Sequence, residues 1–358
     1  MKYNFHITKS DLPKTKPNPD TLKFGRNFTD HMFLMDYDIE KGWHNGRIVP
    51  YGSLSLSPAA SVFHYGQEMF EGMKAYRTPD KRVQLFRPYK NAERVNNSVE
   101  RICMPYMEPE LFVESIKALV DLERDWIPEK EGTSLYIRPF MIATDPFLGV
   151  RASDTYLFVI ILSPVGPYYD TPGGALVPTK IFVEEGFVRA VVGGAGFAKV
   201  GGNYAASLKA QGLAAEKGCE QVMWLDAFEH IFIEEIGTSN AFFKINDEVI
   251  TPPLSGTILP GVTRDSVISL LRKWGIKITE RKLSITEVVE AHKNGSLQEV
   301  FASGTAAVIS PVGTLVYKNE NLVIGSGNVG SLANRLYDTL YGIQTGTLVD
   351  DMGWTVEV

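Results

Sequence analysis

The stretch Gly193-Gly194-Ala195-Gly196-Phe197-Ala198-Lys199-Val200-Gly201-Gly202-Asn203-Tyr204 places a lysine among small residues, with a tyrosine five positions later. Glycine lets a backbone approach a ligand closely because it has no Cβ. A lysine amine held in such a place can form a Schiff base with a carbonyl compound, which makes lysine a covalent catalyst. A turn with a solvated charge gives the same pattern, so Lys199 needs support from the rest of the chain.

The composition is that of a globular protein with two domains. A chain of 358 residues is too long for one ordinary core, and 44% hydrophobic with 22% charged residues are typical values. A net charge of −6 without any basic block argues against nucleic-acid binding. The N-terminus shows no apolar signal region, and the strongly apolar residues 156–162 are too few to cross a membrane. We therefore expect a soluble, cytoplasmic protein.

Cysteine and histidine content argues against two other kinds of site. The two cysteines, Cys103 and Cys219, cannot form a disulfide framework, which fits a reducing compartment. The six histidines show no metal-ligand spacing, so we expect no bound metal. Cys219 follows a predicted helix and is interpreted as buried structure.

Apolar periodicity and capping residues predict the main elements. Helices are expected over residues 109–125, 205–217 and 285–294, the last opened by a capping box at Ser284-Ile285-Thr286-Glu287. Thr263 is expected to cap a helix that runs to about Trp274. Strands are expected over residues 134–141, 155–162, 222–225 and 241–245.

The strongest candidate for a domain boundary is residues 163–178, which contain four prolines and three glycines. We predict an N-terminal domain over residues 1–165, a linker over residues 166–180 and a C-terminal domain over residues 181–358.

A glycine pattern near the C-terminus matches a different kind of site. Gly325-Ser326-Gly327-Asn328-Val329-Gly330 has the G-x-G-x-x-G spacing of a dinucleotide site, between an apolar strand and a helix. Only 28 residues follow Gly330, whereas the dinucleotide fold needs several further strands. We interpret this segment as a strand-to-helix turn.

Three further segments have the composition of ligand-binding turns, at residues 234–240 (EEIGTSN), 259–265 (LPGVTRD) and 302–306 (ASGTA). The second runs from a Pro-Gly turn into a helix start, where free N–H groups and the helix dipole favour phosphate. Taken singly, each is more often an ordinary cap or turn. Together with Lys199 and Tyr204 they supply an amine, a phenol, a carboxylate and two anion sites, which is the set that pyridoxal phosphate requires.

These residues carry a resemblance to a known family. From residue 28 to about residue 342 the chain resembles the branched-chain amino-acid aminotransferases, which are pyridoxal-phosphate enzymes of fold type IV. The motifs that match in order are Phe28-Thr29-Asp30-His31-Met32, Phe70-Glu71-Gly72-Met73-Lys74-Ala75, Tyr136-Ile137-Arg138-Pro139, Lys199-Val200-Gly201-Gly202-Asn203-Tyr204, Glu235-Ile236-Gly237-Thr238-Ser239-Asn240, Leu259-Pro260-Gly261-Val262-Thr263-Arg264 and Ser303-Gly304-Thr305-Ala306.

The resemblance implies a fold and a cofactor site. The fold is α+β or α/β with two domains, a smaller N-terminal α/β domain and a larger C-terminal pseudobarrel domain, assembled at least as a homodimer. Lys199 forms the Schiff base with pyridoxal 5′-phosphate, Tyr204 bonds the ring hydroxyl, and Glu235 bonds the pyridine nitrogen. The remaining cofactor contacts implied are Arg94, Val262, Thr263 and Thr305 at the phosphate, with Thr238 nearby.

The resemblance also implies a substrate pocket. Arg138 meets the γ-carboxylate of glutamate, Thr238 and Ala306 meet the α-carboxylate, and Leu148 and Val150 reach over from a second subunit. An aromatic wall for aliphatic side chains is implied at Phe28, Tyr65, Phe70, Tyr136 and Tyr168. The implied reaction is reversible amino transfer between L-leucine, L-isoleucine or L-valine and 2-oxoglutarate, within branched-chain amino-acid biosynthesis.

Two alternatives remain at this point. D-amino-acid aminotransferases, aminodeoxychorismate lyases and amine transaminases share Lys199, Tyr204 and Glu235, although residues 136–138 and 237–239 favour the branched-chain L-specific members. A binding protein that kept the fold would have no need of the Schiff-base lysine. The sequence leaves open the preference among the three amino acids, the physiological direction, and the assembly beyond a dimer.

Overall fold

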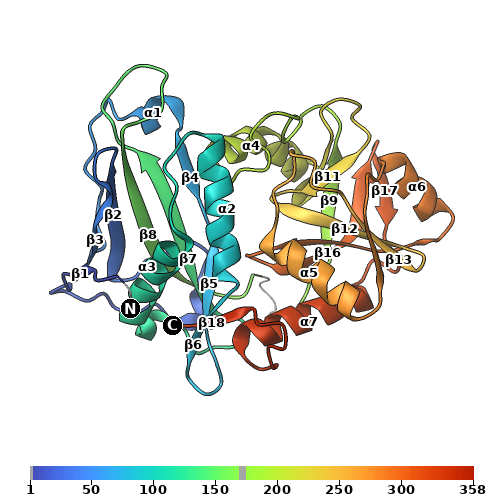
Figure 1. The fold of residues 1–358 in the computed structure, drawn as a ribbon. Helices are drawn as coiled ribbons and strands as arrows, with labels where there is room; N and C mark the ends of the chain where they lie inside the picture. The colour runs from blue at the N-terminus through green and yellow to red at the C-terminus, as the bar shows by residue number, and fades with distance from the viewer. Residues whose placement is uncertain (1–2, 169–174) are drawn as a thin grey trace. The chain divides into compact units, whose positions relative to one another are not determined.

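The computed structural model describes residues 3–168 and 175–358, and the chain folds into two compact units (Figure 1). Unit 1 contains residues 1–168, 198–201 and 342–358, and unit 2 contains residues 169–197 and 202–341. Residues 169–174 of the predicted linker 166–180 lie outside the described residues. The domain division at residues 165 and 181 therefore stays a prediction.

Unit 1 is built on one sheet with the strand order β1-β3-β2-β8-β7-β5-β6-β18, and β4 pairs with β7. The pairings are antiparallel except for β1 with β3. The strands are β1 (His6–Ile7), β2 (His31–Asp38), β3 (Gly42–Pro50), β4 (Glu68–Phe70), β5 (Met73–Arg77), β6 (Val83–Phe86), β7 (Ser134–Ala143), β8 (Thr155–Val165) and β18 (Thr355–Glu357). The helices are α1 (Ser61–Tyr65), α2 (Pro88–Arg101) and α3 (Pro109–Leu122), with 3₁₀ turns at Pro19–Thr21 and Arg124–Trp126.

The core of unit 1 follows from the apolar pattern of its central strands and helices. The strands predicted over residues 134–141 and 155–162 form β7 and β8, which are buried along most of their length. The helix predicted over residues 109–125 forms α3 but ends at Leu122. Its buried stripe packs against β2 and β8, and α3 also contacts α2 (Figure 1).

Unit 2 is built on a closed ring of strands. The order β11-β10-β9-β16-β15-β12 returns to β11 through the β11–β12 pairing, which closes the barrel. The ring strands are β9 (Thr179–Glu184), β10 (Gln221–Leu225), β11 (Ile233–Ile236), β12 (Ser239–Ile245), β15 (Leu297–Gly304) and β16 (Val308–Tyr317), and β13 (Glu248–Thr251), β14 (Lys277–Glu280) and β17 (Glu320–Val323) extend the sheet. The helices are α4 (Gly201–Glu216), α5 (Val262–Lys273), α6 (Ile285–Lys293) and α7 (Ser331–Thr345), of which Gly201 and residues 342–345 belong to unit 1.

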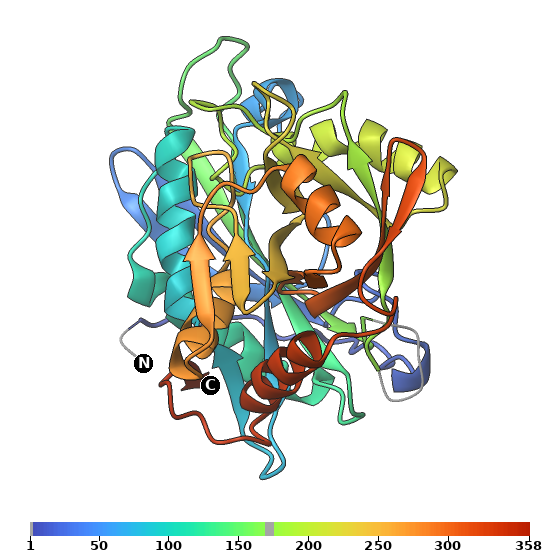
Figure 2. The ribbon, with the colours of Figure 1, turned by 90° about the vertical axis from the view of Figure 1, so that its right-hand side faces the viewer.

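The interior of the barrel is apolar and confirms the predicted pseudobarrel. Side chains from all six ring strands form one buried cluster, which also includes residues of α6. Figure 2 shows α6, in orange, beside these strands. Phe243 of β12 and Val300 of β15, which face each other in register, are both members of this cluster. The ring therefore encloses a packed core instead of an open channel.

Two predicted helix starts differ in detail from the structure. The N-cap of α5 is Gly261, with extended backbone angles, so Thr263 lies inside the first turn and does not cap the helix. Position 261 has no room for a side chain, because a Cβ there would lie 2.0 Å from Oδ1 of Asn240. At α6, Ser284 caps as predicted by accepting from the N–H of Glu287, but the Glu287 carboxylate pairs with Arg281 instead of completing the capping box.

The G-x-G-x-x-G segment is a turn between β17 and α7, as interpreted from the sequence. The carboxylate of Glu299 accepts hydrogen bonds from the backbone N–H groups of Leu332 and Ala333, at 3.0 and 2.9 Å. A Cβ at Gly330 would lie 2.1 Å from the Glu299 carboxylate. This helix start thus binds an anion of its own chain, which removes the donors that a nucleotide phosphate would need.

Both cysteines carry free thiols. Cys219 is buried against Val222 and Trp224 beneath α4, which supports its interpretation as structure. Among residues 3–168 and 175–358, we find no helix with the length and apolar character needed to span a bilayer.

Candidate active site

Lys199 lies in unit 1, although the flanking segments over residues 169–197 and 202–341 belong to unit 2. Its carbonyl accepts from the N–H of Phe70 at 3.0 Å, and its Nζ lies 4.7 Å from the centre of the Phe70 ring. Burial, together with the charge of Arg94, lowers the pKa of the Lys199 amine to about 8, while Glu71 acts in the opposite direction. A larger fraction of this amine is therefore neutral near pH 7 than for an ordinary lysine, and the neutral form is the nucleophile.

Arg94 is buried in α2 and is not the exposed helical arginine that its position alone suggests. Its Nε and Nη2 donate to the two carboxylate oxygens of Glu71, at 2.7 and 2.9 Å. Burial alone would raise the pKa of Glu71, but the charge and hydrogen bonds of Arg94, with further donation from Asn91, hold it below its usual value. Sequence reasoning gave Glu71 no role, although it lies within a quoted motif.

Tyr136 and Arg138 lie on β7 close to Phe70. Nη2 of Arg138 donates to the Tyr136 hydroxyl at 2.9 Å, and the guanidinium lies 4.6 Å from the centre of the Phe70 ring. Gly72 is required beside them, because a Cβ would lie 2.2 Å from the Tyr136 hydroxyl. Nε of Arg138 is buried without a hydrogen-bond partner in the described part of the chain. Such a guanidinium beside a phenol is suited to binding a carboxylate.

The other members of the predicted aromatic wall, Phe28, Tyr65 and Tyr168, also belong to unit 1. Phe28 stacks on Tyr51 with ring centroids 5.0 Å apart. Tyr65 is exposed at the end of α1, and Tyr168 is exposed at the last described residue before position 175. Of the predicted wall, Phe70 and Tyr136 are therefore the members that the structure brings next to Lys199 and Arg138.

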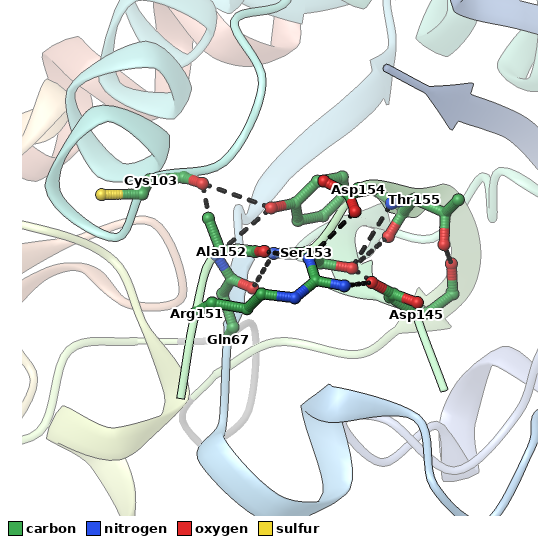
Figure 3. Close-up of polar contacts among 10 residues, drawn as sticks. Gln67, Cys103, Asp145, Arg151, Ala152, Ser153, Asp154 and Thr155 are labelled. Carbon is green, nitrogen blue, oxygen red and sulfur yellow. Dashed lines mark hydrogen bonds and ion pairs between the residues drawn. The ribbon is translucent and has the colours of Figure 1, made fainter. Parts of the chain in front are cut away.

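Leu148 and Val150 lie on an exposed loop over residues 145–153, with 66% and 89% of their surfaces accessible. Figure 3 shows the polar contacts at its base. Arg151 pairs with Asp145 at 2.6 Å, and the Ser153 N–H donates to Oε1 of Gln67 at 3.2 Å. These contacts hold the base of the loop, while the apolar side chains at its tip are exposed.

In unit 2, Glu235 is almost fully buried on β11. Its Oε1 accepts from the N–H of Leu259 at 2.9 Å and from the side-chain amide of Asn240 at 3.1 Å. Nε of Arg189 lies 3.0 Å from its Oε2. By contrast, burial raises the pKa of the neighbouring Glu234, against a smaller opposing effect of Thr257. The Glu235 carboxylate is thus surrounded by two hydrogen-bond donors and one guanidinium group.

The remaining predicted cofactor residues of unit 2 lie at turns and helix starts. Thr238 is exposed in the β11–β12 turn, and Tyr204 is half-buried in the first turn of α4. Val262 and Thr263 begin α5, where N–H groups lack partners within the helix. Thr305 and Ala306 form the turn between β15 and β16.

The Ser303 hydroxyl can donate and accept a hydrogen bond, and the sequence analysis gave this residue no role. Register pairs Glu235 with Asn240 and Asn240 with Ser303, so the three residues share one face of neighbouring strands. The hydroxyl of Ser303 is buried without a hydrogen-bond partner in the part of unit 2 that the structure describes. An orphaned hydroxyl two residues before Thr305 is the kind of group that a bound anion satisfies.

Two of the glycines around Lys199, Gly196 and Gly201, lie where the protein itself leaves no room for a side chain. A Cβ at Gly196 would lie 2.4 Å from the carbonyl oxygen of Thr257, and one at Gly201 would lie 1.9 Å from Oε1 of Glu68. Both positions are therefore closed to a larger side chain by the protein itself.

Comparison with known proteins identifies similar chains. The family model described as amino-transferase class IV matches residues 68–315. Branched-chain-amino-acid aminotransferase 2 of Bacillus subtilis (strain 168) is 56% identical over 357 residues, covering 100% of this chain and 98% of the relative. A solved branched-chain amino acid aminotransferase from T.th. with pyridoxamine 5′-phosphate has a TM-score of 0.75 and 26% identity, covering 92% of this chain and 99% of that one. Its complex with N-(5′-phosphopyridoxyl)-L-glutamate has a TM-score of 0.72 and 26% identity, covering 91% and 97%.

Proposed function

Because this chain belongs to the amino-transferase class IV family, we propose that it is a pyridoxal-phosphate-dependent transaminase. It moves the amino group reversibly between L-leucine, L-isoleucine or L-valine and 2-oxoglutarate. The observation that carries the proposal is the buried Lys199 amine, with a pKa of about 8, in a chain 56% identical to a branched-chain-amino-acid aminotransferase.

The residues fit this cofactor by their chemistry. Lys199 supplies the amine for covalent attachment, and Glu235 supplies a buried carboxylate for the pyridine nitrogen. The first turn of α5 at Val262 and Thr263, Thr305 and the buried cation Arg94 are suited to the phosphate. The hydroxyl of Ser303, which has no hydrogen-bond partner among the described residues, supports an anion near the β15–β16 turn. Tyr204 is assigned to the ring hydroxyl.

Pyridoxal 5′-phosphate supplies an aldehyde and an electron-withdrawing ring that stabilises negative charge at the substrate Cα. Glu235 keeps the ring nitrogen protonated, which strengthens that withdrawal. The Lys199 amine, once free, would take the proton from the substrate Cα and return it at C4′, the aldehyde carbon of the cofactor. Its lowered pKa suits this role, because a general base works best when its pKa is near the working pH.

Substrate choice depends on an apolar side and a cationic side of the pocket. Phe70 and Tyr136 face aliphatic side chains, and Arg138 binds the γ-carboxylate of glutamate. Thr238 and Ala306 bind the α-carboxylate. Apolar contacts separate substrates that differ by one methylene by only about 1–3 kcal/mol, so we expect all three branched amino acids to be used.

Assembly and location complete the proposal. The chain forms a homodimer in which Leu148 and Val150 of one subunit complete the pocket of the other. Their exposure on a loop with a fixed base supports this assignment. Phe28, Tyr65 and Tyr168 complete the aromatic wall, and the enzyme works in the cytoplasm.

The proposal is tested by the absorbance of the purified protein with pyridoxal phosphate, before and after single additions of L-leucine, L-glutamate, D-alanine and a simple chiral amine. We expect the band of the bound cofactor to be lost with both L-leucine and L-glutamate, because these are the two half-reactions. A response restricted to D-alanine or to the amine would contradict the branched-chain assignment. Absence of any cofactor band would contradict the cofactor itself.

A further inference from the structure

The backbone around Lys199 is bound at three points within unit 1. The Lys199 N–H donates to Oγ of Ser98 at 2.9 Å, and its carbonyl accepts from the N–H of Phe70 at 3.0 Å. Two residues later, the N–H of Gly201 donates to Oε1 of Glu68 at 2.6 Å. Ser98 lies on α2 and the other two partners lie on β4, which α2 contacts (Figure 1). The segment 198–201 is thus tied to two elements of unit 1.

Glu68 makes the one contact of the three that involves an ionisable side chain. Gly201 is the first residue of α4, and the first N–H groups of a helix have no partner within the helix. A carboxylate at that end is favoured by the helix dipole and forms a charge-assisted hydrogen bond. Oε1 approaches so closely that a Cβ at position 201 would lie 1.9 Å from it. The glutamate and the glycine are therefore matched to each other.

The same strand also carries the ring against which the Lys199 amine lies. Residues 68 and 70 are two apart on β4, so their side chains leave the strand on one side. Phe70 has its ring 4.7 Å from Nζ, while Glu68 holds the backbone two residues beyond Lys199. Burial raises the pKa of Glu68, and the Gly201 N–H and Arg138 counteract this effect. A short strand therefore fixes both the origin and the surroundings of the lysine side chain.

We propose that Glu68 is a positioning residue for Lys199, whose carboxylate bond to the Gly201 N–H sets the direction in which the lysine side chain leaves the backbone. The inference rests on the proposed function, in which Lys199 carries the cofactor and transfers the proton. Displacement of a reacting group by about 1 Å can reduce a rate by about a hundredfold, so a backbone contact two residues away can matter for catalysis.

The test uses the full-length protein and the variants E68A, E68Q and E40A. Glu40 is an exposed glutamate in the turn between β2 and β3 and serves as the control. The first measurement is amide hydrogen exchange of the peptide that contains residues 199–203, with and without pyridoxal phosphate. E68A should speed exchange at Gly201 by about tenfold or more, because its N–H loses its acceptor. E68Q keeps an amide oxygen at that position and should exchange nearly as slowly as the wild type.

The second measurement is kcat and KM for L-leucine with 2-oxoglutarate. E68A should lower kcat by about 10- to 100-fold with little change in KM, and E68Q should recover most of this loss. If E68A leaves both exchange and kcat at the wild-type level, Glu68 does not position Lys199. Equal losses in E68A and E68Q would assign the effect to charge near Arg138 and would also overturn the proposal.

A double-mutant comparison isolates the contact itself. In the wild-type background, G201A places its Cβ against the Glu68 carboxylate and should lower kcat. In the E68A background, the same substitution should lower kcat much less. Additive effects would show that Glu68 and Gly201 act independently and would contradict the inference. Amide exchange at Gly201 is measured without turnover, so it reports on the Glu68 contact independently of the proposed function. The proposed function is tested separately, by the turnover of K199A.

Discussion

The carboxylate of Glu71 binds the guanidinium of Arg94 through both oxygens, at 2.7 Å from Nε and 2.9 Å from Nη2. The pair is buried, and the same carboxylate also accepts from Asn91 and from the N–H of Gly72. The arginine assigned to the phosphate is thus oriented by a carboxylate that lies 23 residues earlier, in the motif over residues 70–75. Glu71 also lies close enough to Lys199 for the two charges to affect each other.

We predict that E71A destabilises the protein by about 3–5 kcal/mol, because it leaves the Arg94 charge buried without its partner. The free energy of unfolding in urea measures this effect. E93A on the same helix removes an exposed pair with Lys90 and should change stability by less than about 1 kcal/mol. Equal effects of the two variants would argue that the Glu71–Arg94 pair contributes nothing special to the fold.

K199A should abolish turnover and the absorbance band of the covalently bound cofactor, since Lys199 is the amine assigned to covalent attachment. Steady-state rates and absorbance spectra measure both losses. K209A, which removes an exposed lysine of α4, should retain wild-type rates. Wild-type transamination by K199A would refute the assignment.

E235Q should retain the cofactor and lower kcat by about a hundredfold or more, because a neutral amide cannot keep the ring nitrogen protonated. E234Q is a matched control, because the neighbouring Glu234 is also buried. Burial raises the pKa of Glu234, which favours its neutral form. We expect E234Q to keep most of the wild-type kcat. Unchanged turnover in E235Q would mean that another group protonates the ring.

The buried amine of Lys74 predicts that the free energy of unfolding increases with pH. Burial lowers its pKa from 10.5 to about 8. Between these pH values the unfolded chain binds a proton that the folded chain has released, so stability rises with pH by up to about 1.4 kcal/mol per unit. The unfavourable contribution is fully present below pH 8 and is lost as pH rises through 10.5. In urea titrations at pH 8 and pH 10, K74M should gain less stability than the wild type, and an equal gain would contradict the shift.

Gln67 should control the order of the loop over residues 145–153 (Figure 3). Its amide accepts from the Ser153 N–H and donates to the carbonyl oxygens of Ile102 and Cys103. We expect Q67A to speed amide exchange in residues 145–155 and to raise KM for L-leucine more than it lowers kcat. Unaltered exchange in that loop would show that Arg151 and its acidic partners hold the loop without Gln67.

Much of the fold follows from local patterns in the sequence. The apolar runs that form β7 and β8 and the helical stripe of α3 are visible without any structure. Closure of the barrel depends on the pairing of β11 with β12 and on long-range register, which local sequence patterns do not show. The barrel is therefore predicted by the family resemblance alone. The start of α5 was misplaced, since Gly261 caps through backbone conformation and space beside Asn240, for which no side-chain signal exists.

Some residues of the candidate site can be identified from local sequence motifs, whereas others depend on contacts between distant parts of the chain. The motifs around Lys199, Tyr204 and Glu235 can be recognised in the sequence, and the family resemblance implies the role of each residue. No local pattern marks Ser303, whose hydroxyl has no hydrogen-bond partner among the described residues. Glu68, Glu71 and Arg189 were missed because their partners are distant in sequence: Gly201 is 133 residues from Glu68, and Arg94 is 23 residues from Glu71. Carboxylates of that kind look like ordinary surface acids until the fold brings their donors to them.

The division of the chain between its two units has a practical consequence. The chain passes from one unit to the other after residues 168, 197, 201 and 341. A fragment that ends at residue 168 would lack both Lys199 and the strand β18, while the complementary fragment would carry them without the β4 and β6 strands to which they bond. Cutting the gene at the proline-rich boundary would therefore give two incomplete pieces, and efforts to produce either unit alone need grafted segments instead of a single truncation.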